Sequence, residues 1–331
     1  MSFDLDKLSP QTQLEHARSW ASLSSEDLKR LAAKAVLERD HETLWDLTRA
    51  YMFLHGAKGG KVSKHTLKSY RRGVLDLLES WQHENLLRPG RDAGVLYIRT
   101  LETEPKAETG KPLSPATVEV KLAAARTLYK ALRWSGVSEA VPFENVKPAA
   151  DPTPDWEKRQ PYTVREVDAL LELADPSEKV MVLLGAHAGL RISEMVGLSW
   201  SDIDWSRSSL KVLGKGGKRA SVTMSARLEV ELKRLRQLQD ERKRTAQAAD
   251  KVLPWASDRA RGRFKELCQL AGVTYDDKAV HGLRHGAGTR YYAQTKDLGR
   301  VASHLRHENI QTTRVYAKLA DEAIKDDLKD W

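Results

Sequence analysis

A chain of 331 residues exceeds the usual size of one compact domain, so its length predicts two domains. Hydrophobic residues make up 40% of the chain, which is enough for buried cores, and the mean hydropathy of −0.55 is typical of a soluble protein. No apolar run is long enough to span a bilayer, and the acidic start MSFDLDKLSP does not resemble a secretory signal. We therefore expect a cytoplasmic protein with no membrane partner.

The charge is positive and unevenly distributed. A net charge of +9 and an isoelectric point near 9.4 favour a polyanionic partner. Residues 1–50 carry 7 basic against 9 acidic side chains, whereas residues 51–160 carry 18 against 13. This distribution predicts an extra N-terminal segment joined to a part that binds nucleic acid. The single cysteine, Cys268, excludes an internal disulfide and a cysteine metal cluster, and its neighbours in FKELCQLAG predict a buried helix face.

The first half of the chain is predicted to be helical. The serine pair in LSSEDLKRLAAKAVLERD is a favoured helix start, and HETLWDLTRAYMFLHG stops at Gly56. SKHTLKSYRRGVLDLLESW is amphipathic, and LSPATVEVKLAAARTLYKALRWSG begins at the favoured pair Ser114 and Pro115. Seven basic side chains on the last two helices remain for solvent or for phosphate groups: Lys64, Lys68, Arg71, Arg72, Lys121, Arg126 and Lys130.

A charged run with four prolines, VKPAADPTPDWEKRQPY, separates the two halves of the chain. Because proline removes a backbone donor and fixes φ, no helix or central strand is expected there. We expect an N-terminal helical extension at residues 1–56, a nucleic-acid-binding domain at 57–147, a linker at 148–161 and a second domain with a C-terminal tail at 162–331.

The second half opens with a marked helix start. Thr163 and Glu166 form a capping box in TVREVDALLELA, and KVMVLLGAHAGL predicts a buried helix closed by Gly189. Arg191 follows directly. An arginine beside so apolar a segment needs a partner or an anion, and Glu194 is a candidate partner.

SSLKVLGKGGKRASVTM is predicted to form a β-hairpin because apolar and polar residues alternate on both sides of a GKGGK turn. Gly216 and Gly217 would let the backbone approach a ligand closely, with Lys215 projecting into it. The run lacks the spacing and the following helix of a nucleotide-binding P-loop. A long charged helix, ARLEVELKRLRQLQDERKRTAQAADK, is expected after the hairpin.

The segment from His281 to Tyr316 concentrates residues that suit phosphate chemistry. His281 and Arg284 are three positions apart in HGLRH, so they share one face of a helix. Two such groups suit a phosphate, and the Tyr316 phenol in TTRVY is a candidate nucleophile. An isolated H-x-x-R pair, however, more often lies on a solvent-exposed face of a helix and has no catalytic role.

Four motifs in order, GLRISEMVGLSWSDID, the GKGGK hairpin, HGLRH and LRHENIQTTRVY, resemble the tyrosine recombinase family, which includes Xer-type recombinases and phage integrases. SKHTLKSYRR and LSPATVEVKLAAARTLYKAL resemble the core-binding domain of that family, so the likeness covers roughly residues 60–320. It implies a mainly α fold: a helical core-binding domain and an α+β catalytic domain with a small antiparallel sheet. Together these domains would form a C-shaped clamp on duplex DNA.

The resemblance also implies the roles of individual residues. Arg191 and Arg284 would hold the non-bridging oxygens of the scissile phosphate, with Glu194 orienting the first of them. Lys215 would protonate the leaving 5′-oxygen, and Tyr316 would be the nucleophile.

Two histidines complete the implied site. His281 would assist proton transfer, and His307 would hydrogen-bond the phosphate. The six implied catalytic residues are Arg191, Lys215, His281, Arg284, His307 and Tyr316.

The chain departs from the family pattern at three positions. Arg306 replaces the glycine usual before the corner histidine, where a left-handed helix cap would favour glycine. Gly286 and Gly288 stand where the family has better helix formers, at about 1 kcal/mol each relative to alanine. We expect local flexibility beside the site as one result.

The implied function is site-specific DNA recombination through a 3′-phosphotyrosyl intermediate. No metal or cofactor is implied, because the covalent link stores the energy of the broken bond. The implied partners are double-stranded DNA and a homotetramer on synapsed sites, in which the tail AKLADEAIKDDLKDW would pack on a neighbouring subunit, and the protein would be associated with the nucleoid.

Several questions stay open from the sequence alone. A type IB topoisomerase, a telomere resolvase and a catalytically silent DNA-binding regulator are the alternatives, and the set of six candidate residues speaks against the last. The target site, the need for a second recombinase or accessory protein, and the choice between chromosome dimer resolution and mobile-element integration are not determined.

Overall fold

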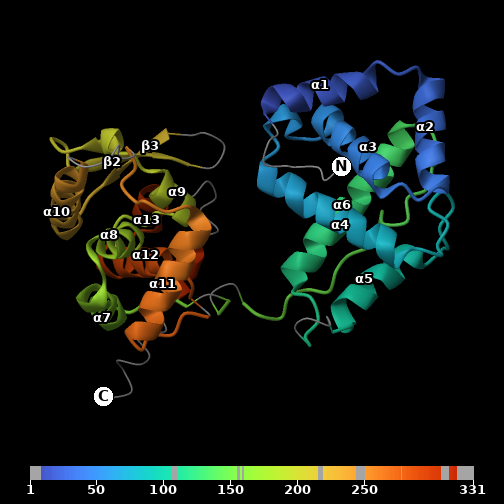
Figure 1. The fold of residues 1–331 in the computed structure, drawn as a ribbon. Helices are drawn as coiled ribbons and strands as arrows, with labels where there is room; N and C mark the ends of the chain where they lie inside the picture. The colour runs from blue at the N-terminus through green and yellow to red at the C-terminus, as the bar shows by residue number, and fades with distance from the viewer. Residues whose placement is uncertain are drawn as a thin grey trace. The chain divides into compact units, whose positions relative to one another are not determined.

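The computed structural model describes residues 9–105, 110–154, 157–158, 160–214, 219–243, 250–276, 278–306 and 313–318. The chain divides into two compact units, Met1–Pro152 and Thr153–Trp331 (Figure 1). In the described segments the fold is mainly helical with one three-stranded antiparallel sheet, so the predicted fold class is confirmed. None of the helices in these segments is long and apolar enough to cross a membrane.

The first unit is a bundle of helices that begin at polar caps. Ser24, Ser63 and Ser114 each accept a hydrogen bond from the backbone N–H three residues on, which satisfies a donor that the helix itself leaves open. Two of the helices, the first and the fifth, were not predicted from the sequence. The helices of this unit are α1 (Pro10–Ala21), α2 (Ser25–Leu37), α3 (His41–His55), α4 (Lys64–Ser80), α5 (Ala93–Thr103) and α6 (Pro115–Trp134), with a 3₁₀ turn, η2 (Gly59–Lys61), before α4.

One hydrophobic core joins all six helices of the first unit. Trp45 of α3 lies in the same buried cluster as Val74 of α4 and Leu128 of α6, and all three are fully buried. Helix α3 contacts α1, α2, α4 and α6. The N-terminal helices therefore contribute to the core of the first unit and do not project from it as a separate body.

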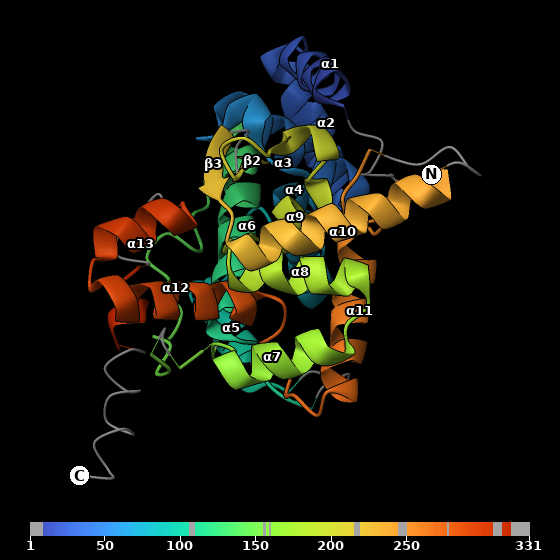
Figure 2. The same ribbon diagram turned by 90° about the vertical axis from the view of Figure 1, so that its left-hand side faces the viewer.

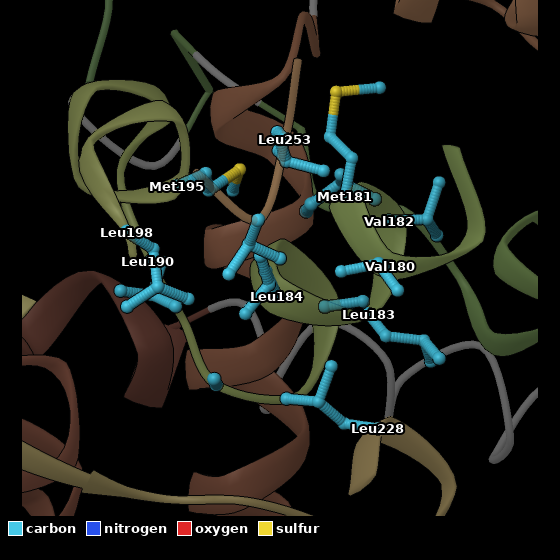
Figure 3. Close-up of a cluster of buried hydrophobic side chains, with 14 of the residues drawn as sticks. Val180, Met181, Val182, Leu183, Leu184, Leu190, Met195, Leu198, Leu228 and Leu253 are labelled. Carbon is cyan, nitrogen blue, oxygen red and sulfur yellow. The ribbon is translucent and has the colours of Figure 1, made fainter. Parts of the chain in front are cut away.

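The second unit is built around one helix that is apolar on every side. Its helices are α7 (Val164–Leu173), α8 (Pro176–Ala186), α9 (Ile192–Gly197), α10 (Ala226–Lys243), α11 (Ser257–Leu270), α12 (His281–Thr295) and α13 (Leu298–Leu305), with a 3₁₀ turn, η3 (Trp200–Asp202). In Figure 2, α8 lies among α7, α10 and α12, all of which contact it. Residues 180–186 of α8 are all buried. Figure 3 shows their side chains meeting Leu190, Met195, Leu228 and Leu253 from the surrounding elements.

The small sheet consists of β1 (Ile203–Asp204), β2 (Ser209–Leu213) and β3 (Arg219–Thr223), in that order and antiparallel. Leu210 pairs with Val222, and both side chains are buried, while the next pair, Lys211 and Ser221, is exposed. This alternation is the one that the sequence predicts, so the hairpin is confirmed. Its tip at residues 215–218, which includes Lys215, lies outside the described residues.

Candidate active site

Arg284 is the most deeply buried charged side chain of the candidate site. It lies one turn into α12 and is 1% exposed. Its guanidinium donates to the backbone carbonyls of Gly189 and Leu305, so it joins the turn after α8 to the end of α13. Burial and the charges of Arg191 and Arg306 lower its pKa to about 10. Arg284 therefore remains charged at neutral pH.

Arg191 stands at the start of α9, directly after the buried helix α8. Its backbone N–H donates to Glu194 Oε2 at 2.9 Å, and its Nη1 donates to Glu194 Oε1 at 3.0 Å. Glu194 is 6% exposed, whereas the Arg191 side chain is 37% exposed. The carboxylate thus holds the arginine from the interior and leaves its outer side open to a ligand. The predicted contact between the two residues is present.

A third arginine enters the same cluster. Arg306 adopts the left-handed conformation at the end of α13, with φ of 55°, and its Nη2 donates to Glu194 Oε2 at 2.8 Å. Burial raises the pKa of the Glu194 carboxyl, but the Arg191 N–H and the charges of Arg306, Arg191 and Arg284 outweigh it. The net effect is a pKa below the ordinary value, so Glu194 is ionised. The sequence drew attention to Arg306 because a left-handed backbone conformation was expected at its position. The contact of its side chain with Glu194 was not predicted.

Tyr316 packs against the arginine cluster from a helical turn at residues 314–318. The side chain is 2% exposed and lies with Ala287, Val301 and Leu305. Burial raises the pKa of its hydroxyl to about 12, while the charges of Arg284 and Arg191 oppose that rise. The phenol is therefore neutral at pH 7, and both arginines act electrostatically on it.

The glycines of α12 are sites of close packing. A Cβ on Gly288 would lie 2.6 Å from Cε1 and Cζ of Tyr316, and one on Gly286 would lie 2.8 Å from the Tyr162 carbonyl oxygen. Real Cβ atoms do not approach other atoms so closely. Neighbouring segments occupy the space that a side chain at either position would need. Close packing therefore explains why glycine stands at these positions, and the local flexibility that we expected is not needed to explain it.

Three aromatic rings connect the start of α12 to the candidate nucleophile. The rings of His281 and His285 are 4.9 Å apart between centroids, and those of His285 and Tyr316 are 5.7 Å apart. His281 is the first residue of α12, as predicted. The sequence did not predict that His285 would lie between the other two rings.

His304 makes a structural contact with the backbone. Its Nε2 donates to the His187 carbonyl at 3.1 Å, which ties α13 to the end of α8. Burial, with the charges of Arg306 and Arg284, lowers its pKa, although the hydrogen bond opposes this. His307, at the centre of the Leu-Arg-His corner, lies outside the described residues.

A cleft of about 540 Å³ opens beside Arg191 and His281. Lys158, Arg261 and Lys278 contribute to its lining. A wall with several cations next to the arginine cluster suits a polyanion. Within the described parts of the chain, no group of three or more His, Cys, Asp or Glu side chains could hold a metal ion.

Two family models match the chain on either side of the proline-rich run. The model of the phage integrase family matches residues 162–323, and that of the phage integrase N-terminal SAM-like domain matches residues 53–136. The chain belongs to the tyrosine recombinase family.

Curated relatives and solved structures agree with this assignment. The recombinase is 28% identical to tyrosine recombinase XerD of Vibrio vulnificus over 285 residues, which cover 80% of this chain and 88% of the relative. It is 26% identical to tyrosine recombinase XerC of Xanthomonas axonopodis pv. citri over 279 residues, or 78% and 88% of the two chains.

The fold is similar to that of two recombinases solved with DNA. A post-cleavage complex of the XerH site-specific recombinase with a palindromic difH substrate matches with a TM-score of 0.66 and 17% identity, covering 100% of this chain and 99% of that one. A lambda integrase dimer on a COC′ core site matches with a TM-score of 0.63 and 13% identity, covering 82% and 75%. At sequence identities this low, the two comparisons show a similar fold and nothing more.

The seven basic residues predicted to contact DNA fall into two groups in the first unit. Lys121 is 7% exposed and forms an ion pair with Asp76 of α4, so the expectation that it faces solvent or phosphate is wrong. Arg126 donates to the carbonyls of Phe143 and Val146 and holds that segment against α6. Arg71 is half-buried and paired with Glu42. The exposed members are Lys64, Lys68, Arg72 and Lys130.

Proposed function

We propose that this recombinase cleaves and rejoins duplex DNA by transesterification at Tyr316. The observation that carries the proposal is the convergence of three chain segments: Arg191 before α9, Arg284 in α12 and Tyr316 after α13, with both arginines acting on the phenol. Two cations act on one buried phenol that packs against Gly288 of α12, and this cluster has the parts that phosphoryl transfer to tyrosine requires.

The reaction exchanges one phosphodiester for another. The Tyr316 oxygen forms a bond to phosphorus while the bond from phosphorus to the 5′-oxygen breaks, leaving a 3′-phosphotyrosyl link and a free 5′-hydroxyl. The phenol loses its proton, and the leaving oxygen gains one. Attack by a 5′-hydroxyl reverses each step and restores the DNA backbone.

The arginines would stabilise charge that develops on the phosphate. Guanidinium groups are planar and always charged at neutral pH, so Arg191 and Arg284 are suited to bidentate contact with non-bridging oxygens. One preorganised donor of this kind contributes roughly 3–4 kcal/mol to the transition state. Glu194 would orient Arg191, in keeping with the 3.0 Å contact between their side chains.

The proton transfers are assigned from the family resemblance. Lys215 would protonate the leaving 5′-oxygen, His281 would assist a proton transfer, and His307 would donate to the phosphate. The place of His281 at the start of α12, with its ring 4.9 Å from that of His285, is consistent with this role.

The first unit would supply most of the DNA affinity. Its exposed cations on α4 and α6, among them Lys68, Arg72 and Lys130, could neutralise backbone phosphates, and such binding weakens steeply with salt. We further propose a tetramer on two synapsed sites in the nucleoid, with the chain after residue 320 packing on a neighbouring subunit. Deleting that tail should spare DNA binding and impair synapsis, and unchanged recombination would contradict the idea.

The experiment that tests the proposal uses a duplex selected by the purified protein from a random-sequence library. A nick a few nucleotides to the 3′ side of the cleavage position lets the short fragment that carries the free 5′-hydroxyl diffuse away, so the covalent intermediate accumulates and is counted on a denaturing gel. The wild-type chain should form a covalent band, and Tyr316→Phe should not.

Tyr292→Phe is the matched control, because Tyr292 is a half-buried tyrosine that packs on the same small cluster as Tyr316. It should retain the band. A band of equal intensity in Tyr316→Phe would refute the proposed nucleophile. Tight binding to the selected duplex with no band in any variant would favour a DNA-binding regulator.

A further inference from the structure

Arg306 stands where the backbone favours a residue without a side chain. At the end of α13 its φ is 55° and its ψ is 47°, which is the left-handed region that glycine adopts most readily. The resemblance to the family places a glycine there. A side chain at such a position calls for an explanation in its contacts.

The Arg306 side chain is directed into the arginine cluster. It is 11% exposed, and its Nη2 donates to Glu194 Oε2 at 2.8 Å. Its Nη1 donates to the His304 carbonyl at 3.1 Å, and its Nη2 also approaches the Gly189 carbonyl at 3.4 Å. Glu194 also holds Arg191, and the Gly189 carbonyl also accepts from Arg284. Arg306 therefore shares one acceptor with each of the two candidate catalytic arginines.

This arrangement changes the charge of the cluster. Arg191 and Glu194 alone form a pair with no net charge, in which the carboxylate competes with a phosphate for the arginine. Arg306 binds the other oxygen of that carboxylate. With Arg284 included, the four groups carry a formal charge of +2, whereas a glycine at position 306 would leave +1.

We propose that Arg306 is a positioning residue of the recombinase active site. It holds Glu194 in place under Arg191 and offsets the carboxylate charge, so that the Arg191 guanidinium is available to the scissile phosphate. Arg306 acts through Glu194 and does not need to touch the DNA. The inference rests on the proposed function, since it assumes that Arg191 binds the phosphate.

The first test compares Arg306→Gly and Arg306→Lys with the wild-type chain in single-turnover cleavage of the nicked duplex at saturating protein. Arg306→Gly removes the charge and suits the left-handed backbone, so cleavage should slow by about tenfold or more. DNA affinity should fall by no more than about fivefold, because many other phosphates contribute to it. Arg306→Lys restores the charge without the fork and should recover part of the rate.

Arg39→Gly is the matched control. Arg39 is also a left-handed arginine, with φ of 53°, and its Nη1 donates to the Trp81 carbonyl at 2.9 Å within the first unit. Its removal should leave the cleavage rate unchanged. If Arg306→Gly cleaves at the wild-type rate, or if Arg306→Lys is as slow as Arg306→Gly, the inference is overturned.

A second measurement does not require chemistry. In the Tyr316→Phe background, the selected duplex is compared with one in which a neutral methylphosphonate replaces the scissile phosphate. With Arg306 present, the replacement should weaken binding about fivefold, and with Gly at that position it should weaken binding less than about twofold. If the methylphosphonate weakens binding by the same factor in both proteins, the inference about Arg306 is overturned. A covalent band that survives Tyr316→Phe would refute only the proposed nucleophile.

Discussion

Gly288→Ala probes whether the packed position of Tyr316 is the productive one. The added Cβ would lie 2.6 Å from two ring carbons of Tyr316 and 2.9 Å from Cδ1 of Leu305. Carbon atoms in contact are about 3.5–4.0 Å apart, so the ring must retreat by about 1 Å. Overpacking of this kind costs about 1–3 kcal/mol, while alanine gains about 1 kcal/mol over glycine within a helix. The net loss of stability should therefore be small, at about 0–2 kcal/mol.

The effect on cleavage should be much larger than the effect on stability. A displacement of about 1 Å at a reacting group lowers the rate by about a hundredfold. We expect that loss in single-turnover formation of the covalent complex, with little change in the urea midpoint or in DNA affinity. Gly262→Ala on α11 is the matched control, because nothing lies within 4 Å of its added Cβ. It should gain about 1 kcal/mol and cleave normally.

The opposite result would be informative. Cleavage by Gly288→Ala at or above the wild-type rate, with normal folding, would refute the reasoning. It would mean that Tyr316 leaves its packed position before it attacks, and that the contacts described for it belong to a resting arrangement.

Three further predictions follow from the charges. The folded pKa of Tyr316 is raised to about 12, so its contribution to stability is complete below about pH 10 and is lost as the pH rises through 12. The free energy of unfolding of Tyr316→Phe, measured in urea, should therefore rise by roughly 2–3 kcal/mol relative to that of the wild type across this pH range. Equal alkaline stability profiles of the two proteins would contradict this. The folded pKa of Glu194 is lowered, so its contribution is present above about pH 4.3 and falls as the pH drops; Glu194→Gln should flatten the acid limb of the stability profile, and an unchanged limb would count against it. Replacing Lys68 and Arg72 by alanine should reduce the salt slope of DNA binding by about 0.9 each, while Arg30→Ala on α2, which is also exposed, should leave it unchanged.

Local signals in the sequence predicted most of the helices. Ser24, Ser114 and Thr163 were recognisable helix starts because each cap is set by residues within one turn. Helix α1 carried the same signal, a serine before Pro10, and was overlooked. Helix α5 had no such signal, since Asp92 at its start makes no side-chain cap.

Contacts between distant residues limited the prediction of the site. Lys121 looked solvent-exposed because its partner, Asp76, lies 45 positions away on another helix. Gly286 and Gly288 looked like flexible points because the atoms that fill their space come from Tyr162 and Tyr316. The motifs placed Arg191, Arg284 and Tyr316 in the sequence, whereas the contribution of Arg306 depends on where a left-handed turn directs its side chain.

The single core shared by α1 to α6 has a practical consequence for dissecting the protein. The family match begins at residue 53, inside α3, and a fragment cut there would lose Leu44, Trp45 and Leu47, all fully buried. The apolar faces of α4 and α6 that these side chains cover would then be exposed to water, and the fragment would aggregate. The first unit should melt in one cooperative transition and should be expressible alone only if it includes the chain from α1 onward.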